Sequence, residues 1–382
     1  MGRSNGKVVL APFVLPGELV SVETVAETKG LVRARLVEVL KPSPHRAEPP
    51  CEYFGRCGGC HYQQAPYAEQ LRWKEAILRE ALRRAGRVEA PEIEVIAGPP
   101  LEYRNRIQLH VEGSRIGYFR SGSHVLQPVM QCPIAAPLLN EAMAHLRQMA
   151  HQPRFPKFLR SIELFTNGER VQVNVRETGA QRVARSFFDW CGKYIPGVAD
   201  ATLEYATAGG TFRVGHRSFF QVNRFLIDRL VQLATAGESG ELALDLFAGV
   251  GLFSLPLARR FGRVVAAEAV RAAAADLEFN AGRAELPVEV QCSTAEMMLA
   301  PMTGAPELVV ADPPRSGLGK GVVRELLRLR PRRLTIVSCE PPTLGRDLAP
   351  LLAGGYRFES LTLIDLFPQT YRIEAVAKLQ AG

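Results

Sequence analysis

The sequence lacks the long apolar runs of a membrane protein. It contains no apolar stretch of about eighteen residues, the length that a membrane-spanning helix needs. Its start, "MGRSNGKVVLAPFVLPGELV", is interrupted by two prolines and has no small-residue cleavage site, so it does not read as a signal peptide. We therefore expect a cytoplasmic protein, and we also expect a monomer.

The cysteines do not form an even set of the kind that disulfide scaffolds use. There are seven among 382 residues, and an odd number in a long chain without a signal peptide favours metal binding or catalysis. Charge is less decisive. The 47 basic and 39 acidic residues give a net charge of +8, which favours a polyanionic partner such as nucleic acid without requiring one. Residues 320–333 hold six basic residues and one glutamate, either as a solvated helix face or as a phosphate-contacting patch.

Three regions differ in pattern. Residues 7–40 alternate apolar and polar positions between turns, which predicts a small β-barrel of the oligonucleotide-binding type, and the proline-rich residues 41–50 predict a linker. An amphipathic helix ending at Gly86 and a mostly β pattern over residues 93–214 predict a central α+β domain. The predicted domains are therefore 1–48, 49–214 and 215–382.

The last region alternates strand and helix patterns, which predicts a parallel, doubly wound α/β sheet covered by helices. The predicted strands are 242–247, 263–269, 307–314, 333–339, 361–367 and 373–379. The last two are separated by only five residues, too few for a crossover helix, so we expect them to pair antiparallel.

Two motifs follow predicted strands of that sheet. In "LDLFAGVGLF", Gly249 and Gly251 let the backbone pass close to a ligand at a helix start, although Ser254 stands where a dinucleotide fingerprint has its third glycine. This loop alone fits NAD enzymes and methyltransferases equally. Glu268 ends the next strand and can accept the hydroxyls of a ribose, or it is an ordinary strand-end carboxylate.

In "DPPRSGL", Asp312 follows an apolar strand and so lies at the edge where open α/β sheets bind ligands. The aromatic residue that adenine and cytosine amino-methyltransferases often carry after the double proline is absent, and Arg315 stands there. This disfavours a reaction on an exocyclic amine. Cys339 also follows a predicted strand, and by itself it fits a nucleophile, a metal ligand or a packing residue.

Four of the other cysteines have metal-ligand character. Cys51, Cys57 and Cys60 are separated by five and two residues, and Cys132 lies far downstream in "QCPI". Four thiolates suit either zinc or an iron–sulfur cluster, and the spacing does not separate the two.

Taken together, these segments resemble the RNA 5-methyluridine methyltransferase family, specifically its iron–sulfur-containing 23S rRNA uracil-5-methyltransferase branch. The matching segments, in the family's order, are "CEYFGRCGGCHYQQ", "YRNRIQLHV", "FRVGHRSFFQVN", "LDLFAGVGLF", "DPPRSGL", "SCEPPTLGRDL" and "LFPQTYRIE". The resemblance implies a C-terminal class I (Rossmann-like) methyltransferase domain, a central α+β domain and an N-terminal TRAM-like β-barrel that is short at its start.

The resemblance also implies an activity: transfer of methyl from S-adenosylmethionine to carbon 5 of a uridine in structured RNA. It makes Cys339 the nucleophile and Glu374 the base. The implied cofactor contacts are Gln221, Phe247, Gly249, Gly251, Glu268 and Asp312. The implied ligands of a 4Fe-4S cluster, structural or RNA-orienting, are Cys51, Cys57, Cys60 and Cys132, which leaves Cys191 and Cys292 as packing residues.

Three positions depart from the family's pattern. Glu340 follows the cysteine where asparagine is usual, Arg372 stands where histidine is usual, and Leu252 stands where asparagine is common. Ribosomal RNA is the favoured substrate and transfer RNA its main rival, with a 5-methylcytosine enzyme a weaker one. A catalytically silent RNA-binding factor is the rival from another class, and retention of Cys339, Glu374 and Asp312 together argues against it.

Overall fold

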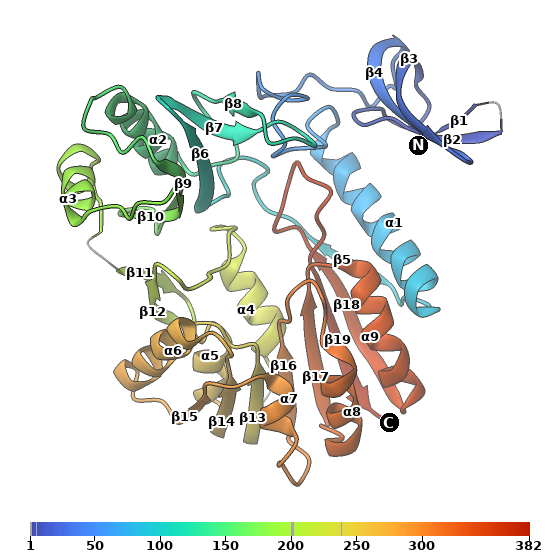
Figure 1. The fold of residues 1–382 in the computed structure, drawn as a ribbon. Coiled ribbons are helices and arrows are strands. Elements are labelled where there is room, and N and C mark those ends of the chain that lie inside the picture. Colours follow the sequence, from blue (N-terminus) through green and yellow to red (C-terminus); the bar gives the residue numbers. More distant parts are fainter. Residues whose placement is uncertain (1, 5, 200–201, 238) are drawn as a thin grey trace.

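The computed structural model describes residues 2–4, 6–199, 202–237 and 239–382. A small sheet at the N-terminus, a central α+β unit and a large sheet flanked by helices follow one another along the chain (Figure 1). Among the described helices, none is long and apolar enough to cross a membrane.

The N-terminal sheet has four strands in the order β1-β2-β4-β3. They are β1 (Gly2–Ser4), β2 (Lys7–Leu10), β3 (Leu19–Thr28) and β4 (Leu31–Lys41). The predicted strands are thus confirmed as a sheet. Glu18 joins this sheet to the linker, because its carboxylate accepts from Arg46 Nη2 at 2.7 Å and from the Leu15 N–H at 2.8 Å. Its pairing with Arg46 lowers the pKa of Glu18 to about 2.

The central unit packs two helices on a five-stranded sheet with the order β10-β9-β6-β7-β8. Its strands are β6 (Arg106–Glu112), β7 (Arg115–Phe119), β8 (Leu126–Pro128), β9 (Leu159–Thr166) and β10 (Val171–Thr178), and its helices are α2 (Pro137–Ala150) and α3 (Arg185–Tyr194). Leu139, Met143, Leu146 and Met149 recur at helical spacing in α2 and are fully buried, which makes this face the core of the unit. The hairpin of β11 (Thr202–Thr207) and β12 (Gly210–Gly215) follows.

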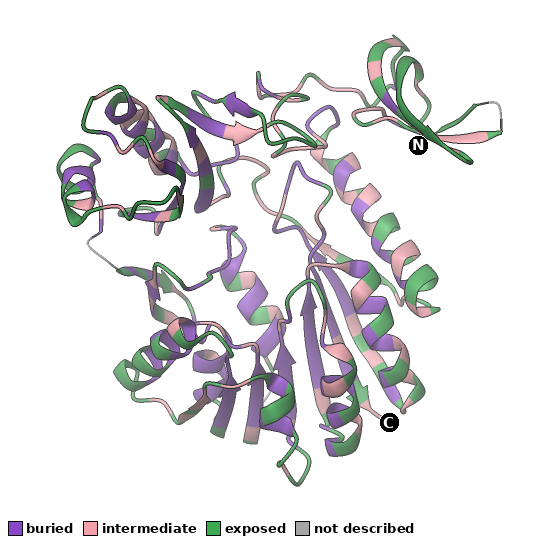
Figure 2. Cartoon of the chain, viewed as in Figure 1, coloured by how far each residue is buried: buried purple, intermediate pink, exposed green. Residues whose placement is uncertain are grey.

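The C-terminal sheet has eight strands in the order β15-β14-β13-β16-β17-β19-β18-β5. In chain order its elements are α4 (Ile227–Thr235), β13 (Gly240–Leu246), α5 (Ser254–Ala258), β14 (Phe261–Ala267), α6 (Arg271–Arg283), β15 (Val288–Gln291), α7 (Ala295–Leu299), β16 (Leu308–Ala311), α8 (Gly319–Leu329), β17 (Arg333–Ser338), α9 (Pro341–Ala353), β18 (Tyr356–Ile364) and β19 (Ala375–Ala381). Strands β13 to β17 pair parallel, and β18 and β19 pair antiparallel, so both predictions are confirmed. Figure 2 shows these central strands buried beneath their helices, as expected for a doubly wound sheet.

One strand and one helix of this sheet come from outside the predicted methyltransferase range. β5 (Ile93–Ile96) pairs parallel with β18, and α1 (Tyr67–Gly86) lies along α9 (Figure 1). The two helices approach closely where two glycines meet, since a Cβ on Gly86 would lie 2.1 Å from the Gly345 carbonyl oxygen. The division at residue 214 stays a prediction, but residues 67–96 pack with the C-terminal sheet.

Candidate active site and cysteine cavity

The glycine loop after β13 has a tightly constrained backbone. Phe247, Gly249 and Gly251 all have positive φ, at 65°, 56° and 95°. A Cβ on Gly251 would lie 2.3 Å from Leu277 Cδ1, so only glycine fits there, whereas a Cβ on Gly249 would meet no atom within 4 Å. The loop therefore packs on α6 at Gly251 and leaves open space beside Gly249, which is the arrangement of a ligand cradle.

Glu268 follows β14 and fixes this loop. Its carboxylate accepts from the Gly249 N–H at 2.8 Å and from the Val270 N–H at 2.6 Å. Glu268 is thus a strand-end carboxylate that holds the glycine loop. Its place at the carboxyl edge of the sheet is compatible with both predictions, a strand-end carboxylate and a ribose acceptor.

Asp245 and Ser254 form a buried pair beneath the loop that sequence reasoning did not assign. The Ser254 hydroxyl donates to the Asp245 carboxylate, so the serine at the missing glycine position has a structural partner. Burial, opposed by the Ser254 hydrogen bond and helped by the carboxylates of Asp312 and Glu268, raises the pKa of Asp245 to about 7. The signal available in the sequence was an aspartate inside an otherwise apolar strand.

Asp312 and Gln221 meet at the same sheet edge. Gln221 Nε2 donates to Asp312 Oδ2 at 3.1 Å, and burial raises the pKa of Asp312 to about 7. The segment that brings Gln221 here is fastened to α6 through Asp276, whose carboxylate accepts from the Gly215 N–H at 2.7 Å and the Ser218 hydroxyl at 2.6 Å.

Cys339 and Glu374 lie one residue beyond a pair of facing strand residues. β17 and β19 are antiparallel neighbours in which Ser338 pairs with Ala375, so the residue after Ser338 and the residue before Ala375 emerge at the same end of the sheet. Cys339 is half-buried, whereas Glu374 is only 4% exposed.

Electrostatics link this pair to Asp312. Burial, helped by the carboxylates of Glu374 and Asp312 and opposed by the Arg315 guanidinium, raises the pKa of the Cys339 thiol to about 11. Burial likewise raises the pKa of Glu374 well above its usual range, with Asp312 adding to the effect. One thiol and two carboxyl groups with perturbed pKa values therefore share the carboxyl edge of the sheet.

The three departing residues lie around this edge. Glu340 directly precedes α9, Leu252 is buried in the core, and the Arg372 N–H donates to Thr370 Oγ1 at 3.2 Å. None of these three residues takes the place of a predicted site residue. The basic residues of the stretch 320–333 are largely exposed on α8 and directly after it, as on a solvated helix face. Some of these arginines also have partners within the chain: Arg328 binds Glu325 and the Leu299 carbonyl, and Arg330 donates to the Gly354 carbonyl.

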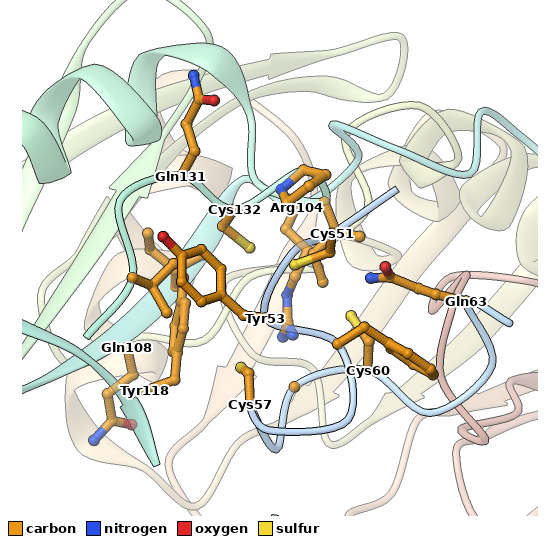
Figure 3. Close-up of a pocket in the computed structure, with 16 residues that line it drawn as sticks. Cys51, Tyr53, Cys57, Cys60, Gln63, Arg104, Gln108, Tyr118, Gln131 and Cys132 are labelled. Carbon is orange, nitrogen blue, oxygen red and sulfur yellow. The ribbon is translucent and has the colours of Figure 1, made fainter. Parts of the chain in front are cut away.

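The four cysteines predicted to be metal ligands border one cavity of about 220 Å³. Figure 3 shows the sulfur atoms of Cys51, Cys57, Cys60 and Cys132 facing a common space. The downstream cysteine is fixed by Asn140, whose Oδ1 accepts from the Cys132 N–H at 2.8 Å and whose Nδ2 donates to its carbonyl at 3.0 Å.

Burial dominates the electrostatics of these thiols. Together with the neighbouring cysteines it raises the pKa of Cys57 to about 11 and that of Cys60 to about 12. Within the described ranges, no three or more His, Cys, Asp or Glu side chains are arranged to hold a metal ion. Cys191 is fully buried in α3, as expected of a packing residue. The same prediction for Cys292 is wrong because that residue is exposed.

Known proteins match the chain over nearly its whole length. A family model described as tRNA (Uracil-5-)-methyltransferase matches residues 197–381. The 23S rRNA (uracil(1939)-C(5))-methyltransferase RlmD of Pectobacterium atrosepticum is 33% identical over 99% of this chain and 90% of its own. A protein of Aquifex aeolicus described as an uncharacterized RNA methyltransferase is 33% identical over 99% of this chain and 94% of its own. The chain belongs to the RNA 5-methyluridine methyltransferase family.

A solved structure agrees with this membership. The Pyrococcus abyssi tRNA (uracil-54, C5)-methyltransferase in complex with S-adenosyl-L-homocysteine has a TM-score of 0.80 and 25% identity over 98% of this chain and 96% of that one. The resemblance drawn from the motifs is confirmed, as is the α/β fold with a class I methyltransferase sheet. This 5-methyluridine methyltransferase family member is an S-adenosylmethionine-dependent RNA uracil-5-methyltransferase.

Proposed function

We propose that this enzyme methylates a uridine of structured RNA through a covalent adduct, with Cys339 as nucleophile and Glu374 as base. The observation that carries the assignment is the β17–β19 pairing, in which Ser338 faces Ala375 and so brings Cys339 and Glu374 to one end of the sheet. The mutual effects of Asp312, Cys339 and Glu374 on their pKa values support a place for Asp312 beside them.

The chemistry needs both groups because carbon 5 of uracil is a poor nucleophile. Bond formation between Cys339 Sγ and carbon 6 moves the ring electrons into an enolate, which makes carbon 5 reactive. Bound S-adenosylmethionine supplies the electrophilic methyl group. Glu374 then takes the proton from carbon 5, the electrons of that C–H bond form the 5,6 double bond, and the C6–S bond breaks to release the Cys339 thiolate.

The raised pKa values suit this sequence of events. A carboxylate whose pKa is raised by burial is a stronger base once ionised, which favours Glu374 for removal of a carbon-bound proton. A pKa of about 11 keeps the Cys339 thiol protonated at neutral pH, so the thiol proton passes to solvent at this half-buried edge as Sγ attacks carbon 6 of the uracil. The target base must be turned out of its stack to reach this half-buried edge.

We assign the cofactor to the cradle beside the glycine loop. The open space at Gly249 and the strand-end position of Glu268 support a ribose site there, and the Gln221–Asp312 pair lies next along the same edge. Phe247 and Gly251 shape the loop through their left-handed backbone. These roles follow the family's pattern at the matching positions.

We assign the cysteine cavity to a 4Fe-4S cluster with a structural or RNA-orienting role. The donor type supports this assignment, since four cysteine thiols line one cavity, although the described side chains are not drawn together into a metal-binding arrangement. A single zinc ion would draw all four sulfur atoms to about 2.3 Å from one centre. A cavity of about 220 Å³ between them suits a polynuclear group better.

We propose 23S rRNA as the substrate, because the similar Pectobacterium atrosepticum protein is named for that reaction and matches over 90% of its length. Transfer RNA is the second candidate, on the likeness to the Pyrococcus abyssi enzyme. We propose that the N-terminal sheet is a TRAM-like RNA-binding module. Either RNA substrate is consistent with a cytoplasmic, monomeric enzyme.

The decisive experiment compares Glu374→Gln with Cys339→Ala on 23S rRNA and on tRNA from cells that lack the enzyme. Glu374→Gln should accumulate a methylated enzyme–RNA adduct that survives denaturing gels, because attack still occurs and proton removal does not. Cys339→Ala should form no adduct. Normal turnover by Glu374→Gln, or an adduct with Cys339→Ala, would assign the roles to other residues.

A further inference from the structure

The loop between β18 and β19, residues 365–373, ends at the proposed base Glu374 and is fixed by an unusual number of buried polar contacts. Lys74 of α1 is fully buried, and its Nζ donates to Asp365 Oδ1 at 2.6 Å and to the Phe367 carbonyl at 2.9 Å. Tyr103 OH donates to the Pro368 carbonyl at 3.0 Å. A loop on the surface would not need these buried partners. We infer that they fix the position of residues 365–373.

Gln369 is the point where these contacts converge. Its backbone is left-handed, with φ at 67°, a conformation that non-glycine residues adopt only when their surroundings impose it. The surroundings are the side chain of Gln70 from α1. Gln70 Oε1 accepts from the Gln369 N–H at 3.0 Å, and Gln70 Nε2 donates to Gln369 Oε1 at 2.9 Å. Gln70 is fully buried, so water does not compete for this pair.

The carbonyl of Gln369 points the other way, to the cysteine segment. It accepts from the His61 N–H at 2.8 Å and from the Tyr62 N–H at 3.0 Å, the two residues directly after Cys60. The His61 ring also packs edge-on against Tyr371, with centroids 4.4 Å apart. Gln369 therefore forms hydrogen bonds both to α1 and to the backbone that directly follows Cys60.

We propose that Gln70 and Gln369 are positioning residues, which hold Glu374 in place and couple the folding of the Cys60 segment to the proton-removal step. The idea rests on the proposed role of Glu374. Only four residues separate Gln369 from Glu374, and Glu374 is itself held by its carbonyl, which accepts from the Ile364 N–H at 3.0 Å. Release of Gln369 would free the loop that precedes Glu374 and leave Cys339, which directly follows β17, unaffected.

The test uses the full chain carrying Gln70→Leu, which removes the amide contacts with little change in volume. Attack by Cys339 should continue while proton removal slows about tenfold, so unmodified uridine RNA should trap as a methylated covalent adduct. Leu78→Ala is the matched control, because Leu78 is fully buried on the same helix and its side chain makes no hydrogen bond to Gln369. It should lower the unfolding midpoint without raising the adduct fraction.

A second variant and a second readout keep the outcomes apart. Gln369→Gly is compatible with the left-handed backbone. It removes the contact of the Gln369 side-chain Oε1 with Gln70 Nε2 but keeps the backbone N–H that Gln70 Oε1 accepts, so it should trap a smaller adduct fraction than Gln70→Leu. In Cys60→Ser, amide hydrogen exchange should rise in the peptide covering 365–374 as well as around residue 60, whatever the activity.

Each failure has its own reading. If wild-type enzyme forms no adduct with 5-fluorouridine RNA, the proposed function fails first. If the wild type traps 5-fluorouridine RNA, but Gln70→Leu accumulates no more covalent adduct with unmodified RNA than the wild type does, the positioning role is refuted. Unchanged exchange over 365–374 in Cys60→Ser refutes the coupling.

Discussion

The two glycines of the cofactor loop should fail in different ways when each is replaced by alanine. At Gly251, φ is +95° and the new Cβ would lie 2.3 Å from Leu277 Cδ1 and 3.0 Å from Leu255 Cδ1. The backbone conformation costs about 1–3 kcal/mol, and forcing a methyl group into a packed core costs about 1–3 kcal/mol more. Gly251→Ala should therefore lower the free energy of unfolding by about 2–6 kcal/mol.

Replacing Gly249 should instead affect cofactor binding more than the stability of the fold. Its φ of +56° lies in the ordinary left-handed region, and its Cβ would meet no atom within 4 Å. The backbone cost is roughly 1–2 kcal/mol. The methyl group would project into the space assigned to the cofactor, so Gly249→Ala should weaken binding of S-adenosylhomocysteine by at least about tenfold, or about 1.4 kcal/mol.

Urea unfolding followed by circular dichroism and calorimetric titration with S-adenosylhomocysteine measure the two effects. Gly282→Ala is the control, since Gly282 lies in α6 with no atom within 4 Å of its Cβ and no positive φ, and it should gain about 0.5–1 kcal/mol of stability. A Gly251→Ala protein as stable as the wild type, or a Gly249→Ala protein with unchanged affinity, would refute this account of the loop.

Three further predictions concern the thiols. Cys339→Ala should abolish methyl transfer and leave S-adenosylhomocysteine affinity within about twofold by calorimetry, because the proposed role of Cys339 is attack on the uracil and not cofactor binding; an equal loss of both would contradict the assignment. Without RNA, alkylation of Cys339 by iodoacetamide should rise about tenfold per pH unit between about pH 7 and 9, because a pKa of about 11 leaves the reactive thiolate a small fraction that grows with pH; peptide mass spectrometry that finds a plateau would contradict the raised pKa. Protein purified without oxygen should be brown and contain about four irons per chain. Cys132→Ser should bleach the colour while cofactor binding survives. Stoichiometric zinc with no iron would contradict the cluster assignment.

The active edge could be predicted from the sequence because its physics is local. Each motif directly follows an apolar, β-branched run, and parallel strands bring such positions to one edge of a sheet. The strand pattern alone therefore predicts that Asp312 and Cys339 lie at the same edge. Glu374 needed the antiparallel return of β19, which the short connection from β18 also predicted.

What the sequence did not reveal depends on long-range contacts. β5 is four residues long, and only its partner β18, more than 260 positions away, makes it part of the C-terminal sheet. The short, partly exposed β15 carried too little pattern to be predicted. Gln70 and Lys74 precede Leu78 and Leu82 at four-residue spacing on one side of α1, but their polar side chains do not mark them as buried, because the 365–373 loop that binds them is distant in the sequence.

The β5–β18 pairing also bears on how the enzyme is made. β18 is synthesised long after β5, so α1 and β5 emerge from the ribosome well before their sheet exists and must wait for the end of the chain. A fragment of residues 215–382 would lack that strand and expose the hydrogen-bonding edge of β18 together with the apolar face of α9. Such a fragment should aggregate on expression, whereas one starting near residue 62 should remain in solution. The catalytic sheet is thus a late product of translation, completed by a segment that was made early.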